Sequence, residues 1–246
     1  MTYESDSGLR SVDRVCDILE ALAASRGGDS LTAISKRCHL AKGSTHRYLT
    51  ALEARGYVER SPDGTLYRLG RGLKLLQVSH LESLTERSVH HLEKLRDQYG
   101  YTANLGLLEN DSVVYLAIVE SAASMRIASR PGDREPLHCT ALGKALLATM
   151  PEDQADQLIA HIDLTARTDR TITKRSVLKS DVQQSRLRGY AIDDCENEVG
   201  GRCVAVALPG DSGAAISMSA PAAHFSMDEV PTVAEALMAT AKLITE

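Results

Sequence analysis

Apolar residues recur at steps of three and four near the start of the chain, and this spacing predicts short helices. The first helix spans about residues 9–24, with an apolar stripe of Val12, Val15, Ile18, Leu19 and Leu22. A second helix begins after Asp29 or Ser30, either of which is a suitable N-cap. A third spans about residues 44–54 and ends before Gly56, a residue type that commonly terminates helices.

Two short segments rich in β-favouring residues follow the third helix. They read YVER and TLYRL, and the turn sequence SPDG separates them. This pattern predicts a β-hairpin. Helices followed by such a hairpin are typical of a winged helix-turn-helix, so residues 1–70 are predicted to form that domain, with residues 1–8 as a disordered tail.

Helical spacing returns over residues 71–99, with a narrow apolar stripe and charged residues elsewhere. The stripe consists of Leu76, Leu81, Leu84, Ser88, Leu92, Leu95 and Tyr99. A stripe this narrow favours a linker helix that pairs with a partner. We therefore place the domain boundary within this helix.

From residue 100 to residue 246 the pattern changes to short strands and helices. Strands are predicted at YTANLGLLE, VVYLAIVE, SMRIASR, YAIDD, RCVAVAL and GAAISMSAP. Helices are predicted at TALGKALLATM, PEDQADQLIAHI, KRSVLKSDVQQSRLRG and MDEVPTVAEALMATAKLI. The fold class is therefore α+β, and the second domain is long enough to bury a core of its own.

The composition is that of a globular protein and narrows the function classes. The chain has 246 residues, of which 43% are hydrophobic and 25% charged. Its aromatic residues are eight Tyr, one Phe and no Trp, too few for a platform that stacks single-stranded bases. No signal pattern and no run long enough to span a membrane is present. Five cysteines without disulfide-type spacing favour reduced thiols in a cytoplasmic protein.

Charge is distributed unevenly along the chain. The net charge is −5, yet residues 31–60 carry six basic and two acidic side chains, a local charge of +4. A basic helix-turn-helix inside an acidic protein favours DNA binding. We expect Arg47 to contact bases, and the wing to contact the backbone or the minor groove. The full set of candidate DNA-contacting residues is Lys36, Arg37, Lys42, Ser44, Thr45, Arg47, Tyr48, Arg60 and Arg68.

Several co-ordered motifs carry a family resemblance over nearly the whole chain. They are LTAISKRCHLAKGSTHRYLTALEARGYVERSPDGTLYRLG, PLHCTALGKALLA, RGYAIDDCENEVGGRCVAVAL and AAISMSAP. In these motifs the chain resembles the IclR family of transcription regulators. The resemblance implies a winged helix-turn-helix joined to a GAF-like effector domain. It also implies a homodimer or dimer of dimers that binds a double-stranded DNA operator of a metabolic operon, more often as a repressor.

The resemblance also implies which residues bind the effector, a small organic acid or aromatic catabolite. The implied positions are Ala141, Leu142, Asp193, Cys203, Ser217 and Ser219, and Met125 is expected to supply an apolar wall. Ser217 and Ser219 lie two apart on a strand and so share a face. Thr140 is a suitable N-cap, and the free N–H groups of the helix after it suit a carboxylate.

Structural roles are the alternative for these same residues. Thr140 would then only cap its helix, Cys203 would pack as a small hydrophobe, and the serines would bond within the sheet. The acidic run Asp193, Asp194, Glu196 and Glu198 is interpreted as a solvated turn rather than a cation site.

The sequence also bears on two other function classes. An enzyme is disfavoured because G-x-S-x-G, H-E-x-x-H and P-loop sequences are absent, so no catalytic residue is expected. A metal- or redox-responsive regulator using Cys139, Cys195 and Cys203, with His138, remains an alternative. These residues lack the C-x₂-C pairing of zinc sites, so neither metal nor cofactor is expected.

Overall fold

A computed structural model describes residues 10–25, 27–210 and 213–246, without the side chains of residues 74–80. The expected tail of residues 1–8 therefore lies outside the described residues. Contacts within the chain divide it into two compact units, Met1–Leu81 and Glu82–Glu246. Each unit is described by itself.

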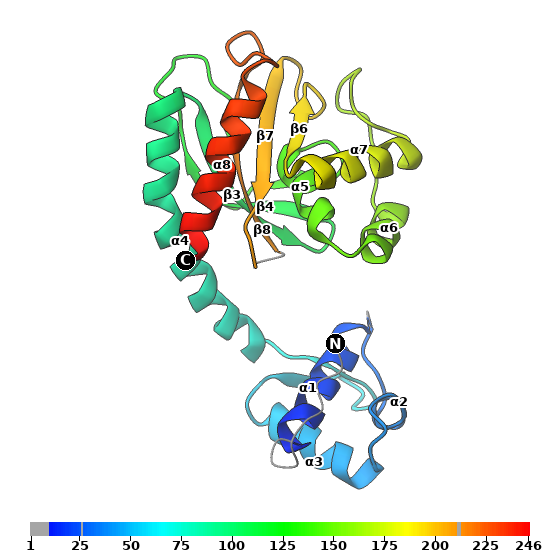
Figure 1. The fold of residues 1–246 in the computed structure, drawn as a ribbon. Coiled ribbons are helices and arrows are strands. Elements are labelled where there is room, and N and C mark those ends of the chain that lie inside the picture. Colours follow the sequence, from blue (N-terminus) through cyan, green and yellow to red (C-terminus); the bar gives the residue numbers. More distant parts are fainter. Residues whose placement is uncertain (1–9, 26, 211–212) are drawn as a thin grey trace. The chain divides into compact units, whose positions relative to one another are not determined.

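Short helices and a hairpin make up the described part of the first unit (Figure 1). In chain order they are α1 (Arg10–Ala23), α2 (Leu31–Arg37), α3 (Lys42–Glu53), β1 (Val58–Arg60) and β2 (Tyr67–Leu69). The two strands pair antiparallel. The core consists of Ile18, Leu22, Ile34, Leu49, Leu52, Val58 and Tyr67. The winged helix-turn-helix expected from the spacing of apolar residues is confirmed.

An antiparallel sheet organises the second unit. Its strands are β3 (Thr102–Glu109), β4 (Ser112–Val119), β5 (Arg134–Pro136), β6 (Ala191–Asp194), β7 (Gly201–Ala207) and β8 (Ala214–Pro221). They lie in the order β5-β4-β3-β8-β7-β6, and all neighbours are antiparallel. The α+β class predicted from the sequence is confirmed.

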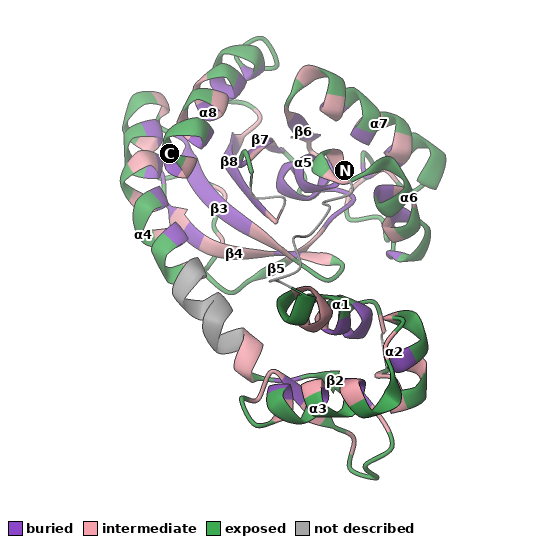
Figure 2. Ribbon diagram, turned by 60° about the horizontal axis from the view of Figure 1, so that its bottom comes forward, coloured by how far each residue is buried: buried purple, intermediate pink, exposed green. Residues whose placement is uncertain are grey.

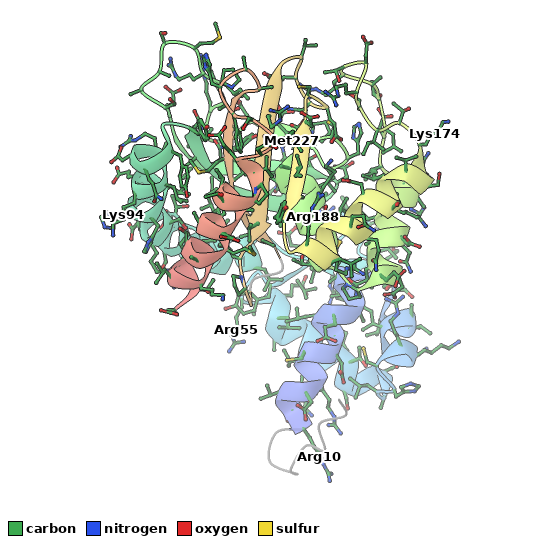
Figure 3. All side chains as sticks on the ribbon, turned by 45° about the horizontal axis from the view of Figure 1, so that its top comes forward. Arg10, Arg55, Lys94, Lys174, Arg188 and Met227 are labelled. Atoms are coloured by element: carbon green, nitrogen blue, oxygen red, sulfur yellow. The ribbon has the colours of Figure 1, made fainter. Side chains whose placement is uncertain are left out.

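Helices cover both faces of this sheet (Figure 1). One face packs against α4 (Gly72–Tyr99) and α8 (Val230–Thr245), and the other against α5 (Ala141–Thr149), α6 (Glu152–His161) and α7 (Arg175–Arg188). In Figure 2, α5 and the central strands β3, β7 and β8 are mostly purple, so the buried core lies between these layers. Lys174 and Arg188, labelled in Figure 3, stand at the two ends of α7.

Side-chain caps hold α5 in place at both ends. At its N-terminus Thr140 Oγ1 accepts a hydrogen bond from Gly143 N at 3.1 Å, as its N-cap role predicts. At its C-terminus Arg186 of α7 donates to the carbonyl oxygens of Ala148 and Met150, at 3.0 and 2.8 Å. These contacts satisfy backbone groups that a helix leaves without partners.

Two expectations about the second unit are wrong. Leu84, Leu92 and Leu95 of α4 are buried against the chain's own sheet and α8, so they are not left for a partner. The side chain of Leu76 in the same stripe is outside the described part. The segment SMRIASR, which contains Met125, forms no strand. The strand that pairs with β4 is instead β5, in which Glu135, ten residues after Met125, is the register partner of Val113.

Candidate nucleic-acid interface and effector cavity

Short polar side chains fix the start of α2 and the turn between α2 and α3. Ser30 caps α2 by accepting from Ala33 N at 3.3 Å, and Ser35 donates its hydroxyl proton to Leu40 O at 2.6 Å. Because Ser35 is buried, the second bond ties the end of the turn to the body of α2. The turn therefore holds α3 at a defined position relative to α2.

Helix α3 has a buried face and an exposed one. Thr45, Leu49 and Leu52 recur at steps of four and three on the buried face. The opposite face, called the outer face of α3 below, consists of Lys42, Gly43, His46, Arg47 and Thr50, all exposed. In the described part of the chain, Lys42 and Arg47 make no ion pair. Both charges are therefore available to a polyanion.

The placement of Thr45 corrects one of the expected DNA contacts. Thr45 is 0% exposed, and its hydroxyl donates to Ala41 O at 3.1 Å. It cannot reach a duplex from this position. Ser44 and Tyr48, which flank the outer face, are half-buried.

The other basic candidates differ in how free their charges are. Lys36 is exposed. Arg37 pairs with Asp29 at 2.9 Å and donates to Ala21 O at 2.6 Å, so it also ties α2 to α1. On the wing, Arg60 lies 3.3 Å from a Glu53 carboxylate oxygen and Arg68 lies 3.7 Å from one of Glu59. These partially exposed pairs are weak, and salt screens them.

Sequence reasoning missed two residues of the outer face. His46 and Thr50 follow Lys42 at steps of four, the spacing that places side chains on one side of a helix. That spacing was present in the sequence and identifies both residues once the helix is known to begin at Lys42.

A polar cavity lies in the second unit, where the start of α5 faces β6, β7 and β8. We call it the sheet cavity. Its lining residues are Tyr115, Ile127, Ser129, Glu135, Thr140, Ala141, Leu142, Asp193, Asn197, Glu198, Gly201, Cys203, Ser217 and Ser219. Six expected effector residues are brought together there, namely Ala141, Leu142, Asp193, Cys203, Ser217 and Ser219.

Strand register explains why residues distant in sequence meet in the sheet cavity. Asp193 pairs with Cys203, and Cys203 pairs with Ser219, so the three form one row across β6, β7 and β8. Directly paired residues point to the same face of an antiparallel sheet. Ser217 lies two residues from Ser219 and therefore also faces α5.

Burial controls the electrostatics of this row. Asp193 is 3% exposed, and burial raises its pKa to about 7. Its Oδ1 accepts hydrogen bonds from the N–H groups of Glu196 and Asn197, at 2.8 and 3.2 Å. Burial and the nearby Asp193 raise the pKa of the Cys203 thiol, so that thiol stays protonated.

The acidic run was expected to be a solvated turn, and its first and third members are buried instead. Asp193 closes the turn by its backbone hydrogen bonds, and Glu196 lies 2.6 Å from the ammonium nitrogen of Lys144. Lys144 of α5 is 1% exposed and also lies 3.0 Å from Asp181 of α7. Through these two ion pairs, Lys144 ties the turn after β6, α5 and α7 together.

Met125 is the expected effector residue that lies outside the sheet cavity. It is 64% exposed and lines a separate hollow with Tyr101 and His224. Ile127 and Ser129 of the same irregular segment reach the sheet cavity instead. Sequence reasoning also missed Glu135, because it lies on the unpredicted strand β5. There it pairs with Arg167 at 2.8 Å, and burial raises its pKa.

The cavity is narrow. About 460 Å³ of space lies between its lining residues, counted with the open mouth, but only about 20 Å³ has room for the centre of a water molecule. That is enough for a single water. A larger ligand therefore requires the walls to move apart.

The cysteines form no metal centre in the described part of the chain. Residues 10–25, 27–210 and 213–246 hold no group of three His, Cys, Asp or Glu side chains suited to a metal ion. Cys139 is buried and donates to Asn197 Oδ1 at 3.3 Å, and burial raises its pKa to about 12. A thiol with so high a pKa reacts poorly with oxidants. In the same part of the chain, no helix is long and apolar enough to cross a membrane.

A winged helix-turn-helix with an exposed cationic helix face, followed by an α+β sheet domain, is the architecture of a DNA-binding transcription regulator. The chain belongs to the IclR family, which confirms the resemblance in its motifs. Residues 11–62 match the IclR helix-turn-helix domain, and residues 76–246 match the bacterial transcriptional regulator IclR C-terminal domain.

Relatives align over almost the whole chain. It is 34% identical over 247 residues to the HTH-type transcriptional regulator BhcR of Paracoccus denitrificans, covering 97% of this chain and 87% of that protein. It is 30% identical over 251 residues to the transcriptional repressor IclR of Escherichia coli, covering 99% and 92%. The solved structure of the Thermotoga maritima IclR is similar with a TM-score of 0.64 at 28% identity, covering 96% and 98%.

Proposed function

We propose that this chain is a ligand-responsive repressor of a metabolic operon. Residues 1–70 bind a double-stranded DNA operator, residues 71–99 link the domains, and residues 100–246 sense a small organic metabolite. The active species is a homodimer or a dimer of dimers, because winged helix-turn-helix regulators read paired half-sites. The similarity to a protein named as a repressor supports the direction of regulation.

DNA binding is assigned to the outer face of α3. A major groove admits one helix, and Arg47 is suited to donate two hydrogen bonds to a guanine edge. Lys36 and Lys42 are exposed and suited to phosphates. His46 and Thr50 complete the reading surface, and Arg60 and Arg68 on the wing add backbone contacts at the expense of their weak ion pairs.

The observation that carries the sensing function is the row of buried polar side chains in the sheet cavity. A core that served only stability would be apolar there, since a buried polar group without a full set of partners costs free energy. Asp193, Ser217 and Ser219 are each less than one-tenth exposed and line the same small space. A ligand with complementary polar groups, an organic acid or aromatic catabolite, offsets that cost.

Ligand binding is coupled to DNA binding through the walls of the cavity. The ligand widens the cavity by displacing α5 or the segment that holds Ile127. Helix α5 is tied by Lys144 to Asp181 and Glu196, so its displacement is transmitted to α7. Allostery requires that the ligand binds one arrangement more tightly, by about 1–3 kcal/mol in typical cases.

DNA binding is tested with the full chain and a fluorescent duplex from its own promoter region. Arg47→Ala is expected to weaken binding about tenfold or more, since a bidentate base contact contributes about 1–3 kcal/mol. Lys94→Ala, which removes an exposed charge from the second unit, is the matched control. Equal affinities for all three proteins would remove Arg47 from the reading surface.

Sensing is tested by melting the full chain with a panel of metabolites, because a ligand that binds only the folded state raises the melting temperature. The double variant Ser217→Ala, Ser219→Ala is expected to lose the shift while keeping the DNA affinity of the ligand-free protein. A normal shift in the double variant would reject the sheet cavity as the sensing site.

A further inference from the structure

Asn104 lies beside the two serines of the sheet cavity, on the neighbouring strand β3. It is 3% exposed on β3 and pairs in register with Ser217 of β8. It does not line the cavity. Its Nδ2 lies 3.1 Å from Ser217 Oγ and 3.3 Å from Ser219 Oγ. An amide nitrogen carries two protons, so it donates to both hydroxyl oxygens at once.

These hydrogen bonds determine what the serines offer to a ligand. A hydroxyl whose oxygen accepts a hydrogen bond still has one proton to donate. Among the described residues, neither serine hydroxyl has an acceptor for that proton. Both serines are nearly fully buried, so the proton is directed into the sheet cavity. Asn104 therefore converts both serines into donors.

The rest of the cavity has a matching polarity. The N–H groups of Ala141 and Leu142 at the start of α5 have no partner in the described part of the chain. The lining includes no lysine or arginine and three carboxyl groups, those of Asp193, Glu198 and Glu135, of which Glu135 pairs with Arg167. The donors available to a carboxylate are therefore uncharged: the two serine hydroxyls and the two N–H groups of α5. Asp193 lies two strands away from Ser219, about 10 Å between backbones at about 4.8 Å per strand. The cavity thus has a donor end and an acceptor end.

We propose that Asn104 is a positioning residue that sets the ligand selectivity of the sheet cavity, by holding Ser217 and Ser219 as donors for a carboxylate. The selected ligand is a carboxylic acid that carries a hydroxyl for Asp193. Its uncharged amide counterpart is rejected, because an amide nitrogen brings protons to groups that already donate. This inference rests on the proposed sensing function of the cavity.

The test replaces Asn104 in the full chain. Asn104→Asp keeps the shape of the side chain and reverses its hydrogen bonds to the serines. The carboxylate accepts both serine protons, so the lone pairs of the serine oxygens turn toward the cavity. Asn104→Leu has a similar volume and removes the donor without adding charge. It serves as the second variant if the buried carboxylate impairs folding.

The probes are matched pairs of acids and amides: glycolate and glycolamide, lactate and lactamide, and 4-hydroxybenzoate and 4-hydroxybenzamide. Thermal shift and calorimetric titration report their binding. The unsubstituted protein is expected to bind at least one acid at least tenfold more tightly than its amide. Asn104→Asp is expected to lose that preference, because its carboxylate takes both serine protons, and Asn104→Leu is expected to weaken it, because the hydroxyls are then free to turn either way. Both variants should keep the DNA affinity of the ligand-free protein.

The outcomes separate this inference from the proposed function. Equal binding of acid and amide by the unsubstituted protein would overturn the donor polarity while leaving sensing intact. An acid preference that stays undiminished in the folded Asn104 variants would overturn the role of Asn104 alone. A protein that binds no acid of the set, and whose DNA affinity no metabolite alters, would overturn both.

Discussion

Asp193 carries a carboxyl group whose buried surroundings disfavour its charged form. Its carboxyl is buried, and the two N–H bonds to its Oδ1 do not compensate fully, so its pKa rises to about 7. Lys144 is close enough to lower that pKa but pairs with Glu196 instead. Buried carboxyl groups with a strongly shifted pKa are frequent at functional sites.

The raised pKa predicts a pH-dependent cost in stability. The folded protein retains the Asp193 proton up to about pH 7, whereas the unfolded chain loses it near pH 4. Between these values the folded state binds more protons, so the free energy of unfolding falls as pH rises. The substitution Asp193→Asn keeps the Oδ1 acceptor without this cost. Relative to the unsubstituted protein, the variant should gain about 1–3 kcal/mol more at pH 8 than at pH 5, measured by urea unfolding.

Asp169→Asn, the same change at an exposed position, is the matched control. A stability difference between the Asp193→Asn variant and the unsubstituted protein that stays constant from pH 5 to pH 8 would contradict the raised pKa.

At the scale of residues, the sequence predicts which side chains share a face of one strand or helix. Ser217 and Ser219 share a face because side chains alternate along a strand. Thr45 was misjudged although its spacing to Leu49 and Leu52 marks a buried stripe. Asn104 and Glu135 had no local signal, because their neighbours in the cavity come from strands that are distant in the sequence.

At the scale of elements, helices were predicted better than short strands. The spacing of apolar residues fixes a helix locally, and helix α4 appears close to where it was expected. Strand β5 has three residues and exists through its pairing with β4. The stripe on α4 shows a further limit. An apolar stripe indicates that a helix face is buried, but not whether the chain's own sheet or a second copy covers it.

The glycines of α3 and α5 give a prediction with opposite signs. Gly143 brings α5 against the preceding segment, where an added Cβ would lie 2.4 Å from Leu137 Cα. An added Cβ on Gly43 meets nothing within 4 Å. Gly143→Ala should therefore destabilise the protein by about 1–3 kcal/mol through overpacking. Gly43→Ala should stabilise it by about 0.5–1 kcal/mol through its helix propensity.

Urea unfolding of the two variants beside the unsubstituted protein measures both effects. The thermal shift with ligand provides a second readout, since Gly143→Ala moves the start of α5 and should also weaken ligand binding. If Gly143→Ala were as stable as the unsubstituted protein, the close packing of α5 on Leu137 would be disproved.

At the scale of the whole molecule, helix α4 belongs to both units. The two units meet at Leu81 and Glu82, within this helix, so its C-terminal part is built into the sheet domain. The sequence predicted that the boundary lies in the helix. It did not reveal that residues 82–99 contribute to the core of the second unit. That contribution depends on how much of the sheet face α8 leaves uncovered, which no local pattern shows.

This division predicts where the chain can be cut. A fragment of residues 82–246 retains Leu84, Leu92 and Leu95 in the core beneath α4 and should unfold cooperatively in urea. A fragment of residues 100–246 loses those three side chains, and each buried leucine contributes about 1.5–3 kcal/mol. The combined loss of roughly 5–9 kcal/mol is comparable to the whole stability of a typical domain, so the shorter fragment should not fold. A cooperative transition in the shorter fragment would mean that α4 is only a linker, and that its leucine stripe is available to a second copy after all.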